Sequence, residues 1–131
     1  MLEIALTCTN ATLRTDEEGT LHLRWVPGSK VSSADADAVV AAVQGVTGAS
    51  LQRMLVEVVD VCVSPGARET LVGMRFVSAV ALVGATVVDR VMAAALLRDQ
   101  ECPHGYFTSM DDAREWLSRL PVPHALEESA V

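Results

Sequence analysis

The chain has 131 residues, of which 50% are apolar, and this fits a single domain that can bury a core without metals or disulfides. Its net charge of −7 and its dispersed basic residues disfavour nucleic acid and membrane surfaces as partners, because phosphate binding needs a stripe of basic side chains. Three widely spaced cysteines, the absence of a secretory leader pattern and the shortness of the apolar runs together predict a cytoplasmic protein with no disulfide framework.

The first third of the chain reads as a hairpin followed by a helix. Residues 2–13 favour extended structure, and a turn at 16–19 leads into a strictly alternating strand at 20–25. Thr20, His22 and Arg24 form the polar side of that strand, which we therefore expect to be half exposed. The helix begins at a capping-box-like sequence over 32–35, and its apolar residues then recur at helical spacing.

The remainder alternates between buried strands and helices. Strands are expected at 54–61, 76–83 and 106–107, and helices at 64–71, 86–98 and 109–120. Because helices separate successive strands, these strands should pair in parallel through right-handed crossovers. The sequence thus predicts one α/β domain over residues 1–120, with a mixed sheet of about five strands and about four helices, followed by a mobile tail over 121–131.

Ligands of such sheets gather outside the carboxyl ends of the parallel strands, where helix starts also offer free amides to an anion. The candidate site residues expected at this edge are Asp60, Ser64, Arg68, Thr86 and Ser109. An alternative interpretation is structural: the three hydroxyl residues are N-caps of the helices that follow them. The sequence leaves both interpretations open.

The order of elements, with a β-branched strand that ends in a polar tip and a serine at the next helix start, resembles STAS domains, the anti-sigma-factor antagonist-like (SpoIIAA-like) fold. It also resembles small uncharacterised proteins that read like Leu-His-Leu-Arg-Trp at 21–25 and end in a Trp-Leu helix. The resemblance covers roughly residues 11–120. For the signalling members it implies that a partner kinase phosphorylates that serine, here Ser64, with Asp60 as the strand-end acid. This chain has Pro65 and a longer loop where those members show an Asp-Ser-x-Gly-like turn.

Two functions from different classes follow. The first is a non-enzymatic STAS-like regulatory or protein-binding domain, in which a phosphate on Ser64 suits a helix start yet disrupts a docked apolar partner. The second is a carrier of a small apolar ligand or lipid, which a closed cavity above about 300 Å³ would favour. An enzyme is disfavoured, because no acid, base and nucleophile set is evident. No cofactor is expected: Cys102 and His104 offer two ligands where zinc needs three or four, and Cys62 has no identified base.

The predicted helix at 86–98 has an unusually broad apolar surface. Either both of its sides are buried within the domain, or the side with Ala93, Ala94 and Leu97 is a subunit interface. The second alternative predicts a homodimer, because alanine lets helices approach each other closely.

Overall fold

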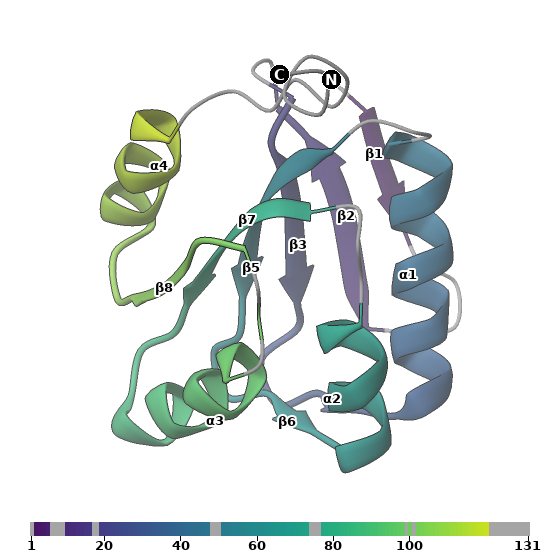
Figure 1. Ribbon diagram of the computed structural model, residues 1–131. Coiled ribbons are helices and arrows are strands. Elements are labelled where there is room, and N and C mark those ends of the chain that lie inside the picture. The colour runs from purple at the N-terminus through teal and green to yellow at the C-terminus, as the bar shows by residue number, and fades with distance from the viewer. Residues whose placement is uncertain are drawn as a thin grey trace.

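The computed structural model describes residues 2–5, 10–16, 19–47, 51–73, 77–98, 100 and 102–120, and the tail expected at 121–131 lies outside them. Within these ranges the chain forms a six-stranded sheet in the order β1-β2-β3-β5-β7-β8 and a separate two-stranded pair, β4-β6 (Figure 1). The strands are β1 (Leu2–Ala5), β2 (Ala11–Thr15), β3 (Leu21–Trp25), β4 (Lys30–Val31), β5 (Gln52–Glu57), β6 (Cys62–Val63), β7 (Val77–Val83) and β8 (His104–Phe107). The helices are α1 (Ser33–Thr47), α2 (Pro65–Val72), α3 (Val87–Leu97) and α4 (Met110–Arg119).

The sheet is mixed, as predicted. β1, β2 and β3 pair antiparallel, while β3, β5, β7 and β8 run parallel to one another. Gly19, with a φ of 82°, belongs to the turn between β2 and β3, in which its amide donates to the carbonyl of Asp16. The sheet has six strands rather than about five, because the segment expected to be extended over 2–13 contains all of β1 and most of β2.

Three helices cover one face of the sheet and the fourth covers the other. Figure 1 shows α4 apart from α1, α2 and α3. The larger core cluster combines side chains from those three helices with one set of strand residues, among them Leu23, Met54 and Leu82. The smaller cluster joins α4 to the alternate set, including Leu55 and Ala81. This division follows from the strand geometry, since successive side chains point to opposite faces.

The expectation that β3 is half exposed is wrong. β3 lies inside the sheet, between β2 and β5, and both Thr20 and His22 are buried. On the polar side predicted for this strand, Arg24 remains exposed. The alternation itself was correct, but an interior strand has a second face that other parts of the molecule cover.

The side of α3 that was considered as a subunit interface faces mainly the core of the domain. Ala93 and Leu97 belong to the core and are 0% and 8% exposed, so they cannot form a surface between subunits. The small alanine lets this side of the helix pack against the sheet. Ala94, the third residue of that predicted interface, is exposed. The exposed side instead carries Val87, Val88 and Val91, which are 78%, 75% and 67% exposed.

No helix in the described part of the chain is long and apolar enough to cross a membrane.

Candidate functional site

The carboxyl edge of the parallel strands is organised around one buried carboxylate, Asp89, which is 3% exposed. Its Oδ1 accepts a hydrogen bond from the backbone N–H of Asp60 at 2.9 Å. Its Oδ2 accepts from the N–H groups of Ala85 at 2.8 Å and Thr86 at 3.1 Å. Asp60 follows β5, whereas Thr86 follows β7. Asp89 therefore brings two of the predicted site residues together.

The charge of Asp89 is matched by its surroundings. Burial by itself raises the pKa of this carboxyl. Hydrogen bonds from the backbone N–H groups of Ala85, Asp60 and Thr86, together with the Thr86 hydroxyl, lower the pKa by more than burial raises it. The pKa of Asp89 therefore lies below its ordinary value. Asp60 itself has a φ of 53°, a left-handed conformation, and its carbonyl accepts from the N–H of Gly28 at 2.8 Å. Both backbone groups of this loop tip are thus held in place.

The three predicted hydroxyl residues are helix N-caps, as one of the two interpretations has it. The Oγ of Ser64 accepts from the N–H of Ala67 at 3.1 Å, and Pro65 occupies the first turn of α2. Thr86 and Asp89 form a capping box at α3, and Ser109 accepts from Asp112 at α4. Satisfying these otherwise unpaired amides is a structural role. It leaves any signalling role of the hydroxyl groups a prediction.

Ser64 and Arg68 lie on a different part of the edge from the Asp89 cluster. Ser64 follows β6, and its N–H donates to the carbonyl of Val31, the last residue of β4. Arg68 lines a groove of about 270 Å³ between α2 and α3. The other residues that line this groove are Pro65, Glu69, Val72, Ala95 and Arg98. Ser109 starts α4, which packs on the opposite face of the sheet.

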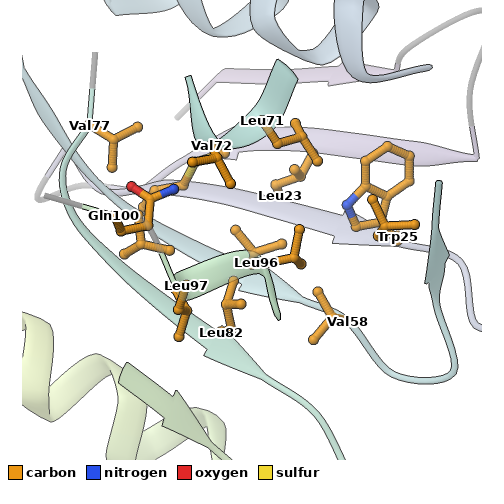
Figure 2. A pocket seen from close by; sticks show the side chains of 14 residues that line it. Leu23, Trp25, Val58, Leu71, Val72, Val77, Leu82, Leu96, Leu97 and Gln100 are labelled. Carbon is orange, nitrogen blue, oxygen red and sulfur yellow. The ribbon is translucent and has the colours of Figure 1, made fainter. Parts of the chain in front are cut away.

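An apolar cavity lies beneath the same two helices, between them and the sheet. Figure 2 shows Trp25 and Gln100 at opposite ends of it, with Leu71 of α2 and Leu96 of α3 between them. Gln100 is the polar member among side chains that are otherwise apolar. The cavity volume is about 60 Å³, room for about two water molecules. A lipid does not fit this volume, and it is well below the roughly 300 Å³ of common ligand pockets.

Sequence reasoning missed a polar cluster on the opposite face, centred on His22. The Nε2 of His22 lies 2.6 Å from Oε2 of Glu57, and its Nδ1 lies 3.1 Å from Nη2 of Arg14. A guanidinium can only donate, so Nδ1 accepts and the proton sits on Nε2, which donates to Glu57. Burial lowers the pKa of His22 most; Glu57 opposes this, while Arg14 and Arg114 add to the lowering. The ring is therefore held neutral between a cation and an anion.

The residues of this cluster can be connected only when the pairing of the strands is known. Arg14 and His22 are direct cross-strand neighbours, and His22 stands beside the strand that carries Glu57. On α4, Arg114 and Ser118 border the small space next to His22. In the sequence these residues look like unrelated members of solvent-facing sides.

The surroundings of Cys62 and Cys102 are not those of a catalytic thiol or a metal ligand. Cys62 is exposed, and Cys102 is partly buried, which raises the pKa of its thiol. His104 donates its ring N–H to the backbone carbonyl of Cys102 at 2.8 Å. Within the described residues, no three His, Cys, Asp or Glu side chains gather as metal ligands would.

Comparison with known proteins identifies a family, and one solved structure supports this architecture. A family model described as a domain of unknown function, DUF7793, matches residues 14–121. A structure from Shewanella loihica PV-4, an uncharacterised protein of the DUF3478 family with a SpoIIAA-like fold, is 14% identical with a TM-score of 0.62; the match covers 82% of this chain and 91% of that one. A protein of unknown function from Arthrobacter sp. FB24 is 30% identical over 82% of this chain and 99% of its own, with a TM-score of 0.33. No curated protein matches. The predicted SpoIIAA-like fold is confirmed.

Proposed function

The chain belongs to the DUF7793 family, and we propose that it acts as a non-enzymatic regulatory domain that binds other protein surfaces. Its contact region is the outer side of α2 and α3 together with the groove between them, which we call the α2–α3 surface. The observation that carries the proposal is the row of three neighbouring valines on α3, Val87, Val88 and Val91, each exposed by two thirds or more. An exposed free thiol at Cys62 fits a reducing compartment, and we assign the protein to the cytoplasm.

Several features of the valine row favour a protein contact over chance exposure. Single exposed apolar residues are ordinary on protein surfaces, whereas contiguous apolar patches mark interaction sites. Val87 and Val91 are one helical turn apart, and Val88 lies beside them, so their side chains form one patch. The patch adjoins a groove with a cation at each side, Arg68 and Arg98. Apolar centre and charged border are the usual parts of an interface.

Ser64 gives this surface a means of control. A phosphate on an N-cap hydroxyl is favoured by the helix dipole and, here, by Arg68 one turn along α2. The same phosphate would place about two negative charges beside the groove and would oppose the docking of an apolar side chain there. Phosphorylation of Ser64 should therefore release a partner without unfolding the domain.

The test is quantitative capture of partners from cell extract by tagged protein, with four forms compared side by side. Val88→Asp and Ser64→Asp should each lower the recovery of the same partners at least about tenfold, since both put a charge on the α2–α3 surface. Leu51→Asp is the matched control, because Leu51 is an exposed apolar residue at the amino end of β5, the opposite edge of the sheet. Equal recovery with all four forms would end the proposal.

A stability control is needed for Ser64. Ser64→Ala removes a cap and should cost about 1 kcal/mol, whereas Ser64→Asp keeps an oxygen that can cap the helix. Capture is therefore measured at a temperature where circular dichroism finds every form folded. A loss of partners with Ser64→Ala alone would indicate instability and not regulation.

The second candidate function, a carrier of a small apolar ligand, would have to use the apolar cavity, whose volume does not favour it. Trp25 at one end of it would report on a bound ligand, but the volume of about 60 Å³ requires α2 and α3 to move away from the sheet before a carrier could load. In a Trp116→Phe form, Trp25 is the sole tryptophan, and titration with decanoic acid should shift its emission if ligands enter. An unchanged spectrum, with no extra mass in native mass spectrometry, would reject a carrier.

A further inference from the structure

We infer that the α2–α3 surface is occupied by the same surface of a second copy of this chain, with the two α3 helices antiparallel across a twofold axis at Val91. This inference rests on the proposed function and names the partner. A twofold contact is isologous, so every residue of the surface must meet a suitable counterpart from the same surface.

The exposed side of α3 has this self-complementarity in side-chain size. With the axis at Val91, residues equally far before and after it face each other. Val88, three residues before, meets the partner's Ala94, three residues after; Val87 likewise meets the partner's Ala95. Each large side chain thus faces a small one on both halves of the contact, which is how closely packed helices interdigitate.

The groove beside α3 adds a place for the outermost valine. Ala95 lines the groove of about 270 Å³ between α2 and α3. In the antiparallel pair the partner's Val87 lies over Ala95 and enters the groove, and the reverse holds for the partner's groove. The contact then extends from α3 onto Pro65 and Arg68 of α2. This extension is required, because specific interfaces bury about 800 Å² on each partner and three valines supply less than that.

Charges at the two ends of α3 favour the antiparallel orientation. Arg98 is exposed at the carboxyl end of the helix, and Asp60 is exposed near its amino end, where Asp89 fixes its backbone. The antiparallel arrangement carries Arg98 of each copy to the amino end of the partner's α3, away from the partner's Arg98. A parallel arrangement would place the exposed Arg98 of one copy beside Arg98 of the other, and the like charges would repel.

Sedimentation velocity between about 1 and 100 µM gives the first test, with a dimer expected for the natural sequence. Val88→Asp should raise the dimer dissociation constant by more than about tenfold, because it would bury a carboxylate against the partner's Ala94. Leu51→Asp, on the opposite edge of the sheet, should leave it unchanged. A monomeric natural protein at 100 µM would overturn the inference, as would a dimer that Leu51→Asp weakens and Val88→Asp does not.

Disulfide trapping tests the register, in a background with Cys8, Cys62 and Cys102 changed to serine. Val91→Cys should form a covalent dimer, because packed helix axes about 8 Å apart place the Cα atoms on the twofold axis within the roughly 7 Å reach of a disulfide. Val87→Cys should not, since those positions are displaced by about 12 Å along the helices. Val87→Cys combined with Ala95→Cys should crosslink again. Equal trapping of the two single variants would refute the antiparallel pairing.

The experiments distinguish a failure of the dimer inference from a failure of the proposed protein-binding function. A monomeric protein whose partners are still lost with Val88→Asp retains the protein-binding function and excludes the second copy as occupant. A dimer that captures no other protein retains the inference and limits the function to self-association. Should Val88→Asp fail to fold, the trapping pattern of the cysteine variants decides.

Discussion

Changing Asp89 to asparagine would test whether this one carboxylate holds the carboxyl edge together. The substitution keeps the shape of the side chain but leaves one oxygen in place of two. Oδ1 now serves Asp60, while Oδ2 serves Ala85 and Thr86. The asparagine NH₂ group must face one of these sets, and it cannot accept from a backbone N–H. At least one donor, and at most two, loses its partner.

The expected cost follows from the kind of bond that is lost. A hydrogen bond to a charged group contributes about 1.5–3 kcal/mol, and a buried donor left without a partner adds its own desolvation. We therefore expect Asp89→Asn to lower the free energy of unfolding by about 2–4 kcal/mol. Domains of this size are typically stable by about 5–15 kcal/mol, so the variant should still fold.

Urea unfolding followed by circular dichroism measures this difference, as a midpoint lower by about 1–2 M. The control is Asp35→Asn, because Asp35 also reaches back to a capping residue, Ser32, but through one backbone bond at the surface; it should cost less than about 1 kcal/mol. The lowered pKa of Asp89 means that its contribution is complete well above 3.8 and disappears as the pH falls through the folded-state pKa. The gap between natural protein and variant should narrow there. A loss below about 1 kcal/mol at pH 7, or one equal to that of Asp35→Asn, would refute this account.

Two further predictions concern His22 and the glycines. Burial holds the pKa of His22 below 6.5, so as the pH falls the unfolded chain takes up a proton before the folded protein does. The free energy of unfolding should therefore decrease as the pH drops from about 6.5 toward the folded-state pKa. His22→Gln should flatten this pH dependence in urea titrations at several pH values, and an unchanged dependence would contradict the burial of the ring. Gly84→Ala would place a Cβ 2.5 Å from the Tyr106 hydroxyl and should lower the free energy of unfolding by about 1–3 kcal/mol in the same assay. Gly45 lies in α1, where an added Cβ would have no neighbouring atom within 4 Å, so Gly45→Ala should raise the free energy of unfolding by about 0.5–1 kcal/mol. Equal effects of the two substitutions would show that the close approach at Gly84 is absent.

Local features of the chain were predicted well because their causes are local. The N-cap of α2 at Ser64 and the capping box at the start of α1 depend on residues three positions apart. The turn at Gly19 depends on one residue that readily adopts positive φ. The parallel order of β5, β7 and β8 followed from the helices between them.

Side-chain environments were predicted less well, because they depend on distant segments. His22 looked solvent-facing until Glu57, 35 residues later, was found beside it. Asp89 has no distinctive sequence signal, although it caps α3 and also binds the loop at Asp60, 29 residues earlier. The broad apolar surface of α3 gave no indication of which side would be covered, and two residues of the side considered as a subunit interface, Ala93 and Leu97, belong to the core.

The sequence by itself determined roughly where the four helices and the main parallel strands lie, that they alternate, and hence that the protein is an α/β domain with polar helix starts along one edge. Hydrophobic period and capping act within a few residues, so they can be read without coordinates. Only the tertiary structure decided which apolar side of α3 faces water and which carboxylate joins β5 to β7. Those outcomes depend on how the packed elements are rotated and paired, and a side chain has no inside or outside until its neighbours are in place.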